Sequence, residues 1–204
     1  MEKDLTAIEI LKEFADSTNR EIVFSEKQYP VKGIYARPFH LEYAIISSRL
    51  EPEVYFVNFS DSKKYGLDAM YSGFFFAIDT PNDFSINIKN KNIIDKLNPF
   101  SKKSLSISKY HEFNSKVLVE CSDLELATNL FDSVKIQDLI IKTLNTDQRF
   151  MLGINNVKID LVPELENKSV FGFFIAEQWL LDNSINEELF SIIKEFKHEL
   201  SIHN

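Results

Sequence analysis

The spacing of apolar positions predicts a helix at each end of the chain. Over residues 5–18 and again over residues 184–201, apolar side chains recur every three or four positions, which places them on one face of a helix. Both segments begin with the spacing of a capping box, in which a Ser or Thr is followed three residues later by Glu. The two predicted boxes pair Thr6 with Glu9, and Ser184 with Glu187.

Between these helices, the first half of the chain predicts strands. From residue 21 to residue 121, short runs rich in Val, Ile, Tyr and Phe are separated by Pro, Asn, Asp and Gly. A hairpin loop is expected at 61–66, a turn at 80–83 and a short helix at 92–97. The predicted strands cover residues 21–24, 39–47, 54–59, 70–79, 85–89, 105–108 and 116–121.

The second half predicts a pair of helices over 123–144, followed by a hairpin over 149–163. Ser122-Asp123 can begin the first helix and Ser133 can cap the second, and Asn155-Asn156 suits a two-residue hairpin turn because Asn tolerates positive φ. Strands cluster first and helices follow, without the alternation of a parallel sheet. The chain therefore predicts an α+β fold, with a mainly antiparallel sheet and helices packed on one side. No linker composition interrupts it, so we expect a single domain over 1–204.

Composition supports a packed core. Phe occurs 18 times, against one Trp, and 44% of the residues are hydrophobic while 26% are charged. This balance is typical of a globular protein. The aromatic runs at 74–76 and 171–174 are best explained as core, since both faces of a strand can be covered. Alternatively, one face is bare and serves as a surface for a partner or for dimerisation.

Charge is unevenly distributed. The net charge of −8 argues against extended nucleic-acid binding, which depends on neutralising phosphates. One lysine-rich segment stands out within this acidic chain. Such a segment can meet an acidic partner or an anionic membrane surface, although it can equally be a set of solvated side chains. The candidate residues for an anionic partner are Lys89, Lys91, Lys96, Lys102, Lys103 and Lys109.

Cysteine usage and targeting signals indicate the compartment. Cys121 is the only cysteine, so no internal disulfide can form. The first residues lack the pattern of a signal peptide, and the longest apolar runs are far too short to cross a bilayer. We therefore expect a cytoplasmic protein. Cys121 follows Val117 and Val119 at strand spacing and is expected to fill the core, and nearby Asp123 would disfavour its thiolate.

Motifs for chemistry are scarce in the sequence. The four histidines are scattered, and no glycine-rich phosphate loop or nucleophile elbow occurs. We therefore assign no catalytic residue, cofactor or metal ligand. An enzyme of unrecognised type would need an acidic pocket. Candidates to line such a pocket are Asp79, Asp83, His111 and Asp123.

Three segments resemble a bacterial family known as domain of unknown function 3137. Residues 71–79 resemble its aromatic-x-Gly-apolar strand, residues 113–123 its Phe-strand-Ser-Asp signature that leads into a helix, and residues 150–163 the hairpin that follows. The likeness covers about the last two-thirds of the chain. It implies a fold, but no activity and no site residues. Many members carry N-terminal membrane spans, which this sequence does not show.

Three functions follow as hypotheses. The leading one is a non-catalytic binding or protein-interaction module, with self-association as a homodimer among its candidate partners. The first alternative is an enzyme with an acidic pocket. The second is a peripheral membrane protein that uses the lysine-rich segment.

Overall fold

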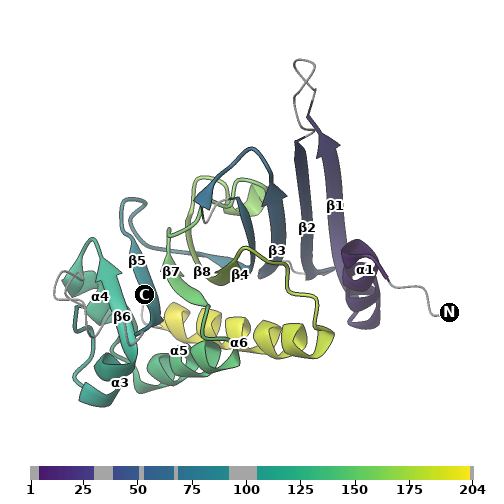
Figure 1. Ribbon diagram of the computed structural model, residues 1–204. Helices are drawn as coiled ribbons and strands as arrows, with labels where there is room; N and C mark the ends of the chain where they lie inside the picture. The colour runs from purple at the N-terminus through teal and green to yellow at the C-terminus, as the bar shows by residue number, and fades with distance from the viewer. Residues whose placement is uncertain (1–4, 30–38, 51–52, 67–68, 92–104, 203–204) are drawn as a thin grey trace. The chain divides into compact units, whose positions relative to one another are not determined.

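A computed structural model describes residues 5–29, 39–50, 53–66, 69–91 and 105–202 (Figure 1). The α+β prediction is confirmed, because helices and antiparallel strands both form. The helices are α1 (Ala7–Ser17), α3 (His111–Lys116), α4 (Leu124–Phe131), α5 (Val134–Thr146), α6 (Asn183–Ile202) and the 3-10 helix η2 (Pro163–Leu165). The strands are β1 (Arg20–Gln28), β2 (His40–Ser48), β3 (Tyr55–Asp61), β4 (Met70–Ile78), β5 (Ile86–Asn90), β6 (Val117–Cys121), β7 (Met151–Ile154) and β8 (Ser169–Ala176).

The chain divides into two compact units that share three elements. The first unit contains residues 1–75 and 174–190, and the second contains residues 76–173 and 191–204. The boundaries fall inside β4, β8 and α6, so each of these elements contributes to both units. The expectation of a single domain over 1–204 stays a prediction.

In the first unit, hydrogen bonds order the strands β1-β2-β3-β4-β8. The three described pairings between β1, β2, β3 and β4 are antiparallel. Phe56 of β3 stands opposite Phe74 of β4, and their rings stack with centroids 4.4 Å apart. Phe14 of α1 and Phe190 of α6 pack edge-on against Phe56, at 6.4 and 6.0 Å. The two helices therefore cover the same face of these strands, as the sequence predicts.

The opposite face of the same strands is also aromatic. Phe59 of β3 pairs with Tyr71 of β4, and Tyr71 contacts both Phe75 and Phe174. All four side chains are buried. This confirms that the aromatic runs of β4 and β8 belong to the core, and it explains why their sequences show no polar alternation.

In the second unit, the strand order is β4-β8-β7-β5-β6, and the described pairings of β5 with β6 and β7 are antiparallel. Phe171 of β8 contacts Phe76 of β4, Phe131 of α4 and Phe196 of α6. All four rings are almost fully buried. Helices α4 and α6 therefore pack on one face of this sheet, and α4 and α5 form the predicted helical pair.

The two predicted capping boxes have different outcomes. At α1 the box is confirmed, because Glu9 N donates to Thr6 Oγ1 and Thr6 N donates to the Glu9 carboxylate. At α6 the box is wrong. Asp182 caps this helix by accepting hydrogen bonds from the backbone N–H groups of Ser184 and Ile185. The bond from Ile185 N, and then the bond from the Ser184 hydroxyl, lower the pKa of the Asp182 carboxyl, as expected for a helix N-cap.

The predicted hairpin over 149–163 is wrong in its second strand. β7 ends at Ile154 and pairs with β5, while residues 157–162 form no strand and lead into η2. Asn155 does adopt a positive φ of 53°. Its side chain donates to Phe84 O and accepts from Val170 N, so it ties the end of β7 to distant segments. These long-range bonds replace the local two-residue turn.

Two other expected elements differ or lie outside the described residues. Residues 105–108 form no strand, although Leu105 N donates to Val119 O at the edge of β6. The short helix expected at 92–97 lies outside the described residues. Within the part of the chain that the structure describes, no helix is both long and apolar enough to span a membrane.

Replacing Glu42 by glutamine should stabilise the protein at neutral pH. Burial, and then repulsion from Glu26 directly opposite on β1, raise the pKa of Glu42. A raised pKa in the folded state means that stability is lost as the pH rises through it. Like charges opposite each other across two strands cost roughly 0.5 kcal/mol. The free energy of unfolding of Glu42→Gln should exceed that of the wild type by about this amount at pH 7.

The gain should disappear as the pH falls below about 4, where both proteins carry a neutral side chain at position 42. Urea unfolding at a series of pH values measures the difference in the free energy of unfolding between Glu42→Gln and the wild type. Glu26→Gln should give a smaller gain, because it removes the repulsion but leaves Glu42 partly buried. An advantage of Glu42→Gln that stays constant down to acidic pH would contradict this explanation.

Candidate ligand pocket between α3 and α5

A surface pocket of about 230 Å³ lies in the second unit, between α3 and α5. The α5 residues that line it are spaced at i, i+3, i+4 and i+7, which is one face of a helix. On the other side, the lining comes from Tyr110 and from α3, which begins directly after it. The lining residues are Tyr110, Glu112, Phe113, Lys116, Val134, Gln137, Asp138 and Ile141.

The apolar part of the pocket lining comes from Tyr110, Phe113, Val134 and Ile141. Phe113 is buried, whereas Tyr110 and Val134 are 53% and 50% exposed. Two large apolar groups therefore lie exposed at the same opening. Exposed apolar groups gathered around a hollow are a common mark of a binding site.

Charged side chains line the same pocket. Lys116 donates to Glu112 over 2.7 Å, one helical turn apart on α3. This hydrogen bond, and then the positive charge of Lys116, lower the pKa of the Glu112 carboxyl. Glu112 is therefore ionised at neutral pH and poorly suited to donate a proton. Asp138 adds a second, exposed carboxylate.

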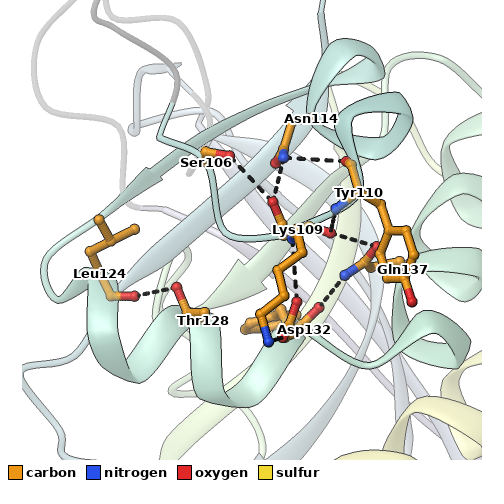
Figure 2. A network of polar contacts seen from close by, with 10 residues as sticks. Ser106, Lys109, Tyr110, Asn114, Leu124, Thr128, Asp132 and Gln137 are labelled. Atoms are coloured by element: carbon orange, nitrogen blue, oxygen red, sulfur yellow. Dashed lines mark hydrogen bonds and ion pairs between the residues drawn. The ribbon is translucent and has the colours of Figure 1, made fainter.

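A polar network fixes the segment before α3 against α5 (Figure 2). The backbone N of Tyr110 donates to Ser108 Oγ over 3.0 Å, and Ser108 Oγ donates to Gln137 Oε1 over 2.9 Å. Asn114 Nδ2 donates to the backbone oxygens of Ser108 and Tyr110. Through these bonds, the aromatic lip of the pocket is held in place by side chains of α3 and α5.

Gln137 is the buried centre of this network. Only 4% of its surface is exposed, and its Nε2 donates to Phe131 O over 3.1 Å while its Oε1 accepts from Ser108. The Gln137 amide on α5 thus joins this helix both to the end of α4 and to the segment that precedes α3. A second link is an ion pair, in which Lys109 Nζ lies 3.4 Å from Asp132 Oδ2 (Figure 2).

None of the four candidates for an acidic pocket lines this one. Asp79 and Asp83 are exposed at the turn after β4. Asp123 caps α4, where its carboxylate accepts from Leu126 N, and His111 is exposed at the start of α3. Among the residues that the structure describes, no group of three or more His, Cys, Asp or Glu side chains could hold a metal ion.

Cys121 lies on the predicted side of β6 but is only half-buried. Burial, and then the negative charge of Asp123, raise the pKa of its thiol. Both effects disfavour the thiolate, in the direction that the sequence indicates.

The lysine-rich segment is only partly described. Lys89 lies half-buried on β5, opposite Leu118. Lys109 forms an ion pair with Asp132. Lys91 N donates to Lys116 O, which places Lys91 beside the end of α3. Lys96, Lys102 and Lys103 lie outside the described residues. An anionic partner for this segment stays a prediction.

Fold and site together define an α+β protein with a small, open pocket that is lined by both apolar and polar side chains. Comparison of the chain with family models, with curated proteins and with solved structures finds no match. The resemblance to domain of unknown function 3137 stays a prediction.

The pocket could not be predicted from the sequence, because one of its walls, helix α3, is too short to be recognised there. Helix α3 has six residues, His-Glu-Phe-Asn-Ser-Lys, with one apolar side chain and no side-chain cap. Six residues are too few to show a helical period. The spacing of Val134, Gln137, Asp138 and Ile141 was the available signal, since it puts an unusual mixture of polar and apolar groups on one face of α5.

Proposed function

We propose that this protein is a non-catalytic binding module that takes one bulky apolar side chain of a partner protein into the pocket between α3 and α5. The observation that carries this proposal is the exposure of Tyr110 and Val134 at the same opening. A partner side chain would remove both from water, and burial of apolar surface is the main driving force of association. The charged groups around it would contact the partner's backbone or polar neighbours.

The size of the pocket favours a protein partner over a metabolite. Sites that enclose a whole small molecule usually measure roughly 300–1,000 Å³. At about 230 Å³ and open to solvent, this pocket fits a single side chain better. Tyr110 N donates to Ser108 Oγ, which donates to Gln137 Oε1, and these bonds hold the lip of the pocket in place, which reduces the entropy lost on binding.

The ionisable groups of the pocket support binding rather than proton transfer. Glu112 is paired with Lys116 and has a lowered pKa, whereas a general acid near neutral pH needs a raised one. Asp138 is exposed. The arrangement therefore offers charge and shape to a partner, with no matched acid and base.

Titration with small probes tests the pocket directly. N-acetyl-leucinamide and N-acetyl-phenylalaninamide carry one apolar side chain each, and can be followed through the amide ¹H–¹⁵N signals of the protein. We expect saturable shifts in residues 110–116 and 134–141, with a Kd in the millimolar range that is usual for such small ligands. Shifts that are absent or spread evenly over the second unit would refute the pocket as a binding site.

Two matched variants sharpen this test. Val134 and Leu124 are the first residues of α5 and α4, and 50% and 44% of their surfaces are exposed. A glutamate is well tolerated at the start of a helix. Val134→Glu should therefore weaken probe binding at least about tenfold, because it puts a charge at the opening. Leu124→Glu should leave probe binding unchanged, and equal losses in both variants would contradict the proposal.

A further inference from the structure

β1 is an edge strand. β1 ends the strand order of the first unit, and among the described residues no strand pairs with its second side (Figure 1). The strand is nine residues long, and Val23, next to its middle residue Phe24, is 50% exposed. A long edge strand with an apolar centre is a template for pairing with another strand.

Hydrogen bonding shows which backbone groups face this edge. Tyr29 N donates to Phe39 O, one step beyond the registered pair of Gln28 and His40. Antiparallel ladders alternate between pairs that exchange both hydrogen bonds and pairs that exchange none. Odd-numbered residues of β1 therefore bond to β2, and even-numbered residues direct their N–H and C=O groups outward. Arg20 O is already occupied, because it accepts from the Arg49 side chain.

The charges of β1 select a particular partner. Glu21 and Lys27 lie three residues on either side of Phe24. On β2, Glu21 stands opposite Ser47 and Lys27 stands opposite Leu41. A second β1 running antiparallel, with the two-fold axis at Phe24, would place Glu21 of each copy opposite Lys27 of the other. No charge lies opposite either side chain on β2, so the two charges are available for such a contact.

We propose that this protein forms a symmetric homodimer through β1, with Phe24 of one copy opposite Phe24 of the other. In this register Ile22 stands opposite Glu26, and the outward-facing pairs exchange about six hydrogen bonds. Glu21 and Lys27 form two equivalent ion pairs. The same patch serves on both copies, as in most two-fold interfaces.

Neighbouring registers are less favourable. Pairing must keep even-numbered residues opposite even-numbered residues, because only these direct their backbone groups away from β2. Centring the axis on Val23 or Ser25 moves Lys27 away from Glu21, and centring it on Glu26 brings two like charges together, which destabilises a strand pair. The register at Phe24 is the one that pairs Glu21 with Lys27.

Sedimentation equilibrium at low ionic strength tests the proposal, using the full chain up to millimolar concentration. The wild type should dimerise. Lys27→Glu and Glu21→Lys should each raise the dimer Kd about tenfold or more, since each turns two attractive pairs into repulsive ones. The double swap should restore the Kd to within about threefold of the wild-type value. High salt should reduce the differences.

Reciprocal loss and rescue would support the pairing, because a change in fold would not be repaired by the second swap. A dimer Kd that stays unchanged in both Lys27→Glu and Glu21→Lys would overturn this interface. A strictly monomeric wild type would overturn self-association itself and leave the edge for a strand of another protein. The edge is separate from the pocket between α3 and α5, so probe titration of Lys27→Glu keeps the two proposals distinguishable.

Discussion

Phe190→Ala is expected to lower the free energy of unfolding by about 4 kcal/mol, near the upper end for a phenylalanine in a packed core. Phe190 is 2% exposed, and its ring lies 4.9 Å from that of Phe74, 6.0 Å from Phe56 and 6.1 Å from Phe14. The alanine would leave a cavity bordered by three aromatic rings on two strands and a helix. Large rings cannot easily collapse into such a space. Equilibrium unfolding in urea, followed by circular dichroism, measures the loss.

Arg20 adds a second part to this effect. Its guanidinium lies 3.9 Å from the centre of the Phe190 ring, and the residue is 8% exposed. It also donates to both carboxylate oxygens of Glu187. A buried cation over an aromatic face gains about 1–2 kcal/mol, and Phe190→Ala would remove that interaction while leaving the cation buried.

Two comparisons separate packing from charge. Phe190→Leu should cost clearly less than the alanine variant, because leucine fills most of the space. A double-mutant cycle between Phe190→Leu and Arg20→Met should show a coupling energy of about 1 kcal/mol. A loss below about 2 kcal/mol for Phe190→Ala would show that the rings close the cavity, contrary to the expectation.

Gly153→Ala should be equally severe for a different reason. A Cβ atom at position 153 of β7 would lie 1.8 Å from the backbone oxygen of Ile86 and 2.8 Å from its carbonyl carbon. Both atoms belong to β5, which is held by pairing with β6 and β7, so the strands would have to separate. We expect a loss of at least about 3 kcal/mol, beyond the usual cost of overpacking.

Gly66 provides the matched control. It has a φ of +72°, and a Cβ there would meet nothing within 4 Å. Gly66→Ala should therefore cost only about 1 kcal/mol, from the left-handed backbone alone. Urea midpoints of both variants, with the yield of soluble protein, decide the comparison. Equal losses at the two positions would mean that β5 and β7 adjust easily, against the proposed steric cause.

Elements with a strong local signal were predictable from the sequence. α1 and α6 carry long apolar stripes, and the predicted strands that correspond to β2, β3 and β4 are rich in β-branched and aromatic residues. β1 was predicted only over 21–24, because its second half, Ser-Glu-Lys-Gln, is polar, and the strand in fact continues to Gln28 through its pairing with β2. Errors arose where distant residues compete with a local pattern. Ser184 and Glu187 have the spacing of a capping box, but Asp182 supplies the cap and Glu187 is taken by Arg20, which is 167 positions away.

The hairpin was predicted wrongly, and the pocket was not predicted, for the same physical reason. β7 finds its partner in β5, and no two-residue turn rule contains that information. The pocket depends on Gln137, whose amide joins Phe131 and Ser108 from two other segments. Local spacing specifies which face of α5 is polar, but only tertiary packing specifies what that face meets.

The way the chain passes between the two units has a consequence for folding during synthesis. Residues 174–190, which supply the end of β8 and Phe190, belong with residues 1–75, yet all of 76–173 is translated between them. The aromatic cluster of the first unit therefore lacks a member until that long insert has left the ribosome. Nascent chains with β1 to β4 already made would still expose Phe56 and Phe74, and such exposed strands are where chaperones bind or aggregates begin.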